Sequence, residues 1–208
     1  MITEAHNRAA HDKMVHDPAT SDPATMDARD SQMQMQMSEA ELNQILVRWN
    51  DTRADYPSEL CLHQVFEAQS QRTPNSVAVE YENVTLTYAE LDRRANQLAR
   101  YLRNRGAEVE GRVAVCLKRS FELPVALLAV LKAGAACVPL DPNYPEERLE
   151  LMLRDAAPAV LLADESSLKK FSSAKFASSS LEIVGLPQEW AQVSQEDDKR
   201  IACEVRPA

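Results

Sequence analysis

Short apolar runs alternate with helix-length segments through the middle of the chain, and this alternation constrains the fold more than any other feature. Residues 112–117, 136–140 and 159–163 are strand-length runs rich in Val, Leu and Ala. An apolar helix-length segment at 121–132 separates the first two runs, and a second helical pattern begins at Pro145. Strands alternating with helices predict an α/β fold, a β-α-β-α-β parallel sheet with right-handed crossovers and flanking helices.

Branched side chains of these runs should fill the centre of the predicted sheet. The expected residues are Val113, Val115, Leu117, Val138, Val160, Leu161 and Leu162. The run at 136–140 is expected to be a buried strand. Residues 181–186 offer one further strand after a Ser-rich stretch at 172–180, which is typical of a loop. We therefore expect the domain body over residues 60–186 and a polar tail over 187–208.

Two capping boxes mark the starts of helices. Ser38 with Glu41 opens a short helix expected to end near Trp49, and Thr87 with Glu90 opens a longer one. The longer helix carries a regular apolar stripe. Its members are Leu91, Ala95, Leu98, Ala99 and Leu102. The arginines of the same region are expected to form its solvated face. They are Arg93, Arg94, Arg100, Arg103 and Arg105.

A second helix and a hairpin are expected between these two capping boxes. The helix follows a polar linker at 50–57 and should turn one face toward the core. That face consists of Leu62, Val65, Phe66 and Gln69. Alternating side chains at 77–81, a tight turn at Glu82 and Asn83, and a run at 84–87 predict two short strands.

The N-terminal region lacks the large apolar side chains that a packed core needs. Residues 1–37 are therefore predicted to be a disordered tail, and residues 38–59 a linker that carries the short helix. The chain shows no signal-peptide pattern and no apolar run near the ~20 residues of a membrane-spanning helix. A net charge of −9 argues against binding to nucleic acid or an anionic membrane. We expect a cytoplasmic protein.

The cysteines and glycines offer no recognisable cofactor or metal site. The four cysteines include no C-x-x-C pair, and Cys116 and Cys137 lie in apolar runs as expected of core residues. The four glycines form no G-x-G-x-x-G loop and no P-loop. His63 stands without an evident partner and is expected to be a structural or surface histidine. We therefore assign no catalytic, cofactor-binding or metal-binding residue.

Two segments resemble core motifs of the amino-acid adenylation domains of nonribosomal peptide synthetases. Residues 86–91 (LTYAEL) resemble the first motif, and residues 131–141 (LKAGAACVPLD) resemble the second, longer one. Cys137 departs from the family pattern, which has Tyr there. Residues 141–148 continue the second motif as the peptide-synthetase branch does, and residues 49–57 resemble the linker between a condensation and an adenylation domain.

This resemblance implies the N-terminal part of an enzyme that activates an amino acid with Mg-ATP. The family forms an aminoacyl adenylate and passes the acyl group to the phosphopantetheine thiol of a carrier domain. The phosphate loop, the specificity pocket and the catalytic Lys of such an enzyme would follow this segment. The implied partners are the remainder of the adenylation domain or module and the carrier and condensation domains. The chain alone is expected to bind no cofactor, to be inactive and to be marginally stable.

Two other functions stay open at the level of sequence. One is a fragment of an acyl-CoA or aryl-acid synthetase, and the other is a free-standing, non-enzymatic α/β interaction module. The condensation-type linker at 49–57 favours the peptide-synthetase origin over the first. Monodisperse, stably folded behaviour of the isolated chain would favour the second.

Overall fold

The computed structural model describes residues 37–171, 181–203 and 205–207. Most of the expected N-terminal tail and the Ser-rich stretch at 172–180 lie outside these residues. The chain divides into two units, Met1–Asp55 and Tyr56–Ala208, which are described separately.

The described part of the first unit is a short, exposed helix. It comprises α2 (Glu39–Asn43) and a π-helical continuation, η1 (Gln44–Arg48), with Trp49 as its C-cap. The Ser38 hydroxyl accepts the backbone N–H of Glu41, and the Glu41 carboxylate accepts the backbone N–H of Ser38. The expected capping box and the helix end near Trp49 are therefore confirmed.

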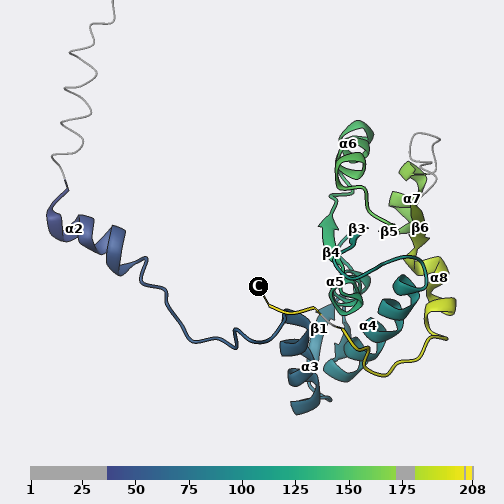
Figure 1. Ribbon diagram of the computed structural model, residues 1–208, viewed down its shortest axis with the longest axis horizontal. Helices are drawn as coiled ribbons and strands as arrows, with labels where there is room; N and C mark the ends of the chain where they lie inside the picture. Colours follow the sequence, from purple (N-terminus) through teal and green to yellow (C-terminus); the bar gives the residue numbers. More distant parts are fainter. Residues whose placement is uncertain (1–36, 172–180, 204, 208) are drawn as a thin grey trace, which may run out of the picture. The chain divides into compact units, whose positions relative to one another are not determined.

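The second unit is built on a four-stranded parallel sheet (Figure 1). Its strands are β3 (Arg112–Cys116), β4 (Ala136–Pro139), β5 (Val160–Ala163) and β6 (Glu182–Gly185), in the order β4-β3-β5-β6. All three neighbouring pairs are parallel. The predicted α/β fold and the additional strand near 181–186 are therefore confirmed.

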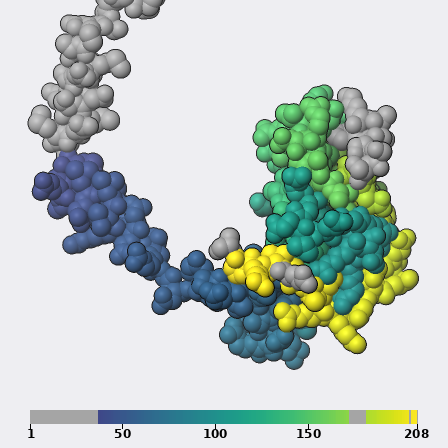
Figure 2. Space-filling view, viewed as in Figure 1, coloured from purple at the N-terminus to yellow at the C-terminus, as the bar shows by residue number. Residues whose placement is uncertain are grey.

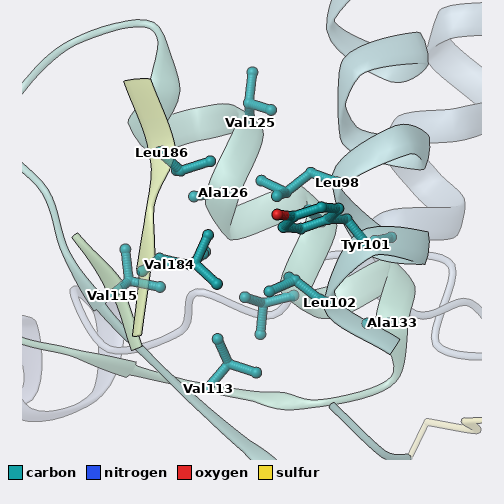
Figure 3. Packing of buried hydrophobic residues seen from close by; sticks show 14 of the residues in the cluster. Leu98, Tyr101, Leu102, Val113, Val115, Val125, Ala126, Ala133, Val184 and Leu186 are labelled. Atoms are coloured by element: carbon teal, nitrogen blue, oxygen red, sulfur yellow. The ribbon is translucent and has the colours of Figure 1, made fainter. Parts of the chain in front are cut away.

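One face of the sheet packs against three helices, α4 (Tyr88–Arg103), α5 (Glu122–Ala133) and α8 (Leu186–Val193). Figure 3 shows Leu98, Tyr101 and Leu102 projecting from α4 toward Val184 of the sheet. The stripe predicted for α4 is confirmed, because every member is at most 3% exposed. Alternate strand residues face this side because successive side chains of a strand point to opposite faces. This face holds the larger apolar core.

The other face packs against α6 (Glu146–Ala156) and α7 (Glu165–Phe171). Leu149 and Leu153 of α6 and Phe171 of α7 are buried there against Ala114 and Leu161. With helices on both sides, the central strands are shielded as parallel sheets require.

A helix and a hairpin precede the sheet in this unit. The helix α3 (Leu62–Arg72) is followed by β1 (Val77–Tyr81) and β2 (Val84–Thr87), which pair antiparallel. Glu82 and Asn83 have φ of 48° and 66°, as a tight two-residue hairpin turn demands. The predicted hairpin and its turn are therefore confirmed.

The inward face predicted for α3 is wrong at Leu62 and Val65, whereas Phe66 packs against the core as predicted. Leu62 is 70% and Val65 39% exposed, whereas His63, Glu67 and Ser70 are buried. The prediction placed apolar side chains inward by default. In the structure, α3 faces a buried lysine, and that partner requires a polar inward face.

The strand β4 is an edge strand and not the buried strand that was predicted. Ala136 and Pro139 are exposed, and Cys137 and Val138 are half-buried. The backbone N–H of Ala136 donates to the carbonyl of Gly111, just before β3, and the N–H of Leu140 donates to the carbonyl of Val115 within it. By alternation, Cys137 and Pro139 turn their backbone groups outward, and Pro139 has no N–H to offer there.

Among the described residues, no helix combines the length and apolar character needed to cross a membrane.

Candidate functional site

Three loops meet at the carboxyl edge of the sheet because parallel strands end on the same side. They follow β3, β4 and β5. Asp164, just after β5, links two of them by accepting the backbone N–H of Lys118 at 2.9 Å. The same carboxylate accepts the hydroxyl of Ser166 at 2.7 Å and the N–H of Ser167 at 2.8 Å. Burial favours a raised pKa for Asp164, but these hydrogen bonds outweigh it and lower the pKa below its ordinary value.

The loop after β4 is held by its own side chains and by α7. The Asp141 carboxylate accepts the backbone N–H of Asn143 at 2.9 Å, which forms a local turn. The Lys170 ammonium of α7 donates to the carbonyls of Pro142 and Tyr144. The loop is therefore fixed to the α7 side of the sheet.

An open groove of about 770 Å³ lies between the loops that follow β3 and β4. Apolar side chains from α5 and α6, including Leu123, Leu127 and Met152, line part of it, and exposed Lys118 and Arg119 contribute charge. The ends of parallel strands are the usual place for ligands in α/β folds. The described residues hold no cluster of three or more His, Cys, Asp or Glu side chains that could bind a metal ion, in this groove or elsewhere.

A buried lysine forms the second polar cluster of the unit, away from the carboxyl edge. Lys132 of α5 is 0% exposed, and its ammonium lies 2.5 Å from Glu67 Oε1 of α3 and 2.9 Å from Asp92 Oδ1 of α4. Glu67 Oε2 lies 2.8 Å from Arg200 Nε. The formal charges of these two carboxylates and two cations cancel, which is how a folded protein tolerates buried charge.

His63 lies beside this cluster and is 5% exposed. Burial lowers the pKa of His63 below its ordinary value, and the positive charges of Lys132 and Arg200 lower it further against the opposing charge of Glu67. These surroundings therefore favour the neutral form of the imidazole. The sequence predicted a structural or surface histidine, and it gave no sign of the charged neighbours that surround His63.

The expected solvated arginine face is also wrong for four of its five residues. Arg94 lies over the Trp190 ring at 5.9 Å, and Arg105 pairs with Glu182 at 3.5 Å. Arg103 donates to the Ala133 carbonyl, at the C-terminus of α5. Arg100 binds carbonyl oxygens of the C-terminal segment. Arg93 alone of the five is exposed. These arginines were misplaced because their partners lie far away in the sequence.

We define the strap as residues 194–203, the segment that follows α8. Figure 2 shows the C-terminal part of the chain, in yellow, lying along the surface between the blue residues of α3 and the teal body of the unit. Residues 187–208, expected as a polar tail, thus include most of α8 and a segment packed on α4. Sequence patterns offered no signal for this packing.

The thiols predicted as core residues are unreactive by their surroundings. Cys116 is buried and Cys137 is half-buried. Burial raises the pKa of both thiols above the ordinary value. A raised pKa keeps the protonated, unreactive form at neutral pH.

The chain is 54% identical over 129 residues to malpinin synthetase of Mortierella alpina, an overlap that covers 62% of this chain and 2% of that protein. It resembles the α-methyl-L-serine-AMP-bound structure of the nonribosomal peptide synthetase FmoA3, with a TM-score of 0.67 and 25% identity over 77% of this chain and 17% of that one.

A further solved structure isolates the corresponding part of a relative. The N-terminal subdomain of NpsA from Klebsiella oxytoca, in complex with 3-hydroxybenzoyl-AMSN, matches with a TM-score of 0.57 and 25% identity, covering 68% of this chain and 34% of that one. The chain thus spans only a small share of the proteins it matches. The family model described as "AMP-binding enzyme" matches residues 66–205. The chain therefore belongs to the AMP-binding enzyme family, and its relatives are adenylation domains of nonribosomal peptide synthetases.

Proposed function

We propose that this chain supplies the N-terminal scaffold of an adenylation domain that activates an amino acid with Mg-ATP. The activated aminoacyl adenylate would then load the phosphopantetheine of a carrier domain. The fold of residues 131–141 carries the proposal, because the second motif forms the end of α5, the left-handed turn at Gly134 and the strand β4. The match to an adenylate-bound peptide synthetase supports the same assignment.

The proposed role of this chain is to position and not to catalyse. The printed sequence has four glycines and no glycine-rich phosphate loop. The groove at the carboxyl edge is lined by apolar side chains and by Lys118, Arg119 and Asp141. We propose that the remainder of the adenylation domain packs over this groove and brings the phosphate loop, the specificity pocket and the catalytic lysine. Mg-ATP would bind to that assembled site and not to this chain alone.

The flanking segments fit a synthetase module. We propose that residues 38–59 form the linker that joins the domain to a preceding condensation domain, and that residues 60–186 form the shared domain body. The module would act in the cytoplasm. These boundaries and partners belong to the proposal and are supported by the motif resemblance at 49–57.

A chimera tests the proposed function. In an adenylation domain of malpinin synthetase, the segment matched by this chain is replaced with the corresponding residues of this chain. We expect amino-acid-dependent ATP–pyrophosphate exchange by the chimera within about tenfold of the parent domain, since replacing scaffold leaves the reacting groups in place. The 208-residue chain alone should show none above background.

Two outcomes would contradict the proposal. A folded chimera with no exchange would show that this scaffold does not support the chemistry. Exchange by the chain alone, in a preparation free of host synthetases, would show that it holds catalytic groups of its own.

A further inference from the structure

The strap is held to α4 through its main chain. Three side chains of α4 donate to five strap carbonyl oxygens. The contacts are Gln97 to Ser194 and Glu196 at 2.8 and 3.2 Å, Asn96 to Asp198 at 2.9 Å, and Arg100 to Asp197 and Lys199 at 2.9 and 2.6 Å. Asn96 and Gln97 are buried, at 2% and 4% exposure. Carbonyl groups are common to all residues, so this grip does not depend on the strap's sequence.

One strap side chain makes a specific charge contact. Arg200 Nε lies 2.8 Å from Glu67 Oε2, and the Glu67 side chain is only 6% exposed. The other carboxylate oxygen of Glu67 faces Lys132 at 2.5 Å. Lys132 therefore fixes Glu67 with one oxygen turned toward the strap. The Arg200 side chain itself is 61% exposed and can leave without opening the core.

The end of the strap fits a notch made by a glycine. A Cβ on Gly134 would lie 3.2 Å from Cys203 Sγ and 3.4 Å from Val205 Cγ2. The Cys61 thiol, at the start of α3, contacts the Val205 carbonyl at 3.5 Å. Gly134 thus ends α5 and also leaves room for the chain that follows Arg200.

We propose that Lys132 and Gly134 of the second motif, together with Glu67, form a receptor for the strap, and that Arg200 is the charge that engages it. The receptor latches residues 194–203 of this chain against α3, α4 and α5. The motif then has a second role besides building α5 and β4, because it sets where the chain runs after α8. This inference does not rest on the proposed function.

Site-resolved thiol labelling of the full 208-residue chain tests the latch. Native protein is treated with iodoacetamide, and modification at each cysteine is followed by mass spectrometry. In Arg200→Ala, we expect Cys203 to label about tenfold faster than in the parent chain, since a charge-assisted contact to a buried carboxylate is lost and the strap opens locally.

The neighbouring cation and two other thiols serve as controls. Lys199→Ala removes a strap ammonium that no carboxylate receives among the described residues, so the labelling of Cys203 should not change. Cys116 is buried in the sheet and reports on the fold as a whole, whereas half-buried Cys137 reports on the edge strand β4. An unchanged rate at Cys203 in Arg200→Ala would overturn the proposal. A parallel rise at Cys116 would overturn it too, because Arg200 would then hold the whole fold and not the strap.

Discussion

Lys132 Nζ lies 2.5 Å from Glu67 Oε1, and the two side chains are 0% and 6% exposed although they are 65 residues apart in the sequence. The pair joins α5 to α3 through charge. A buried ion pair costs desolvation of both groups, so its partners depend strongly on each other. The stability of this corner of the molecule should therefore respond sharply to the loss of either charge.

Removing the buried ammonium should destabilise the fold severely. In Lys132→Met, Asp92 stays in place without a cation and Glu67 keeps only the exposed Arg200, so we expect the free energy of unfolding to fall by ~3–5 kcal/mol. Urea denaturation followed by circular dichroism measures this loss. The matched control is Lys118→Met at an exposed position, which should change stability by less than ~0.5 kcal/mol. Equal effects of the two substitutions would contradict a role for the buried pair.

Stability should fall with acidification in a window set by His63. Its pKa in the folded state is lowered from 6.5, so the unfolded chain takes up a proton before the folded chain does. The contribution of His63 to the free energy of unfolding is then fully present above pH 6.5. It is lost as the pH drops toward the folded-state pKa, by up to ~1.4 kcal/mol per pH unit. Chemical denaturation between about pH 7.5 and 5.5 measures the slope. His63→Gln should flatten it, and an unchanged slope would assign the effect to other groups.

Replacing glycine with alanine should destabilise the fold by different amounts at two helix ends. Gly134 and Gly106 both have positive φ, of 89° and 91°, so alanine is strained at either position. At Gly134 the new Cβ would also lie 3.0 Å from Val109 Cγ2, whereas nothing lies within 4 Å at Gly106. Gly106→Ala should cost ~1 kcal/mol and Gly134→Ala at least ~1 kcal/mol more. Thermal melts measure the loss of stability in both variants, and equal losses would contradict tight packing around Gly134.

The hydroxyl of Tyr101 should stabilise the junction of α4 with α8. It donates to Glu189 Oε2 at 2.5 Å and lies 3.0 Å from Gln192 Oε1. Burial, followed by the contact with Glu189, raises the pKa of Tyr101 to about 12. Tyr101→Phe should lower the free energy of unfolding by ~1–3 kcal/mol, because a carboxylate loses its donor. Tyr144→Phe, on a half-buried tyrosine outside this junction, is the control for the same denaturation measurement, and a matching loss there would refute the assignment.

The apolar framework could be predicted from the sequence, and the polar one could not. The stripe of α4 and the strands around Val115 and Leu161 follow a helical or strand period, and the structure buries them as expected. Periodicity identifies buried residues only when they are apolar. It therefore missed the buried polar residues His63 and Glu67 of α3, which lie next to Lys132 of α5.

The position of Lys132 in the sequence is itself a signal of an unusual environment. Lys132 is the single charged residue within the apolar run from Leu123 to Ala133. A charge in such a run indicates either a surface position or a buried pair, and the distinction depends on partners far away in sequence. The position of the strap on α4 could not be predicted from the sequence. Its carbonyl contacts with Asn96 and Gln97 are made by the main chain, which carries no pattern in the sequence.

The backbone groups that β4 turns outward limit the addition of a further strand at this edge of the sheet. Because Pro139 lacks an N–H and Ala136 and Val138 face β3, Cys137 is the residue of β4 whose amide can donate to a strand arriving from outside. A foreign segment that extended the ladder could donate to the outward carbonyls of Cys137 and Pro139, but it would find no N–H at Pro139. The exposed edge is therefore a weakened template for the stacking that leads to fibrils, because one donor of its ladder is missing.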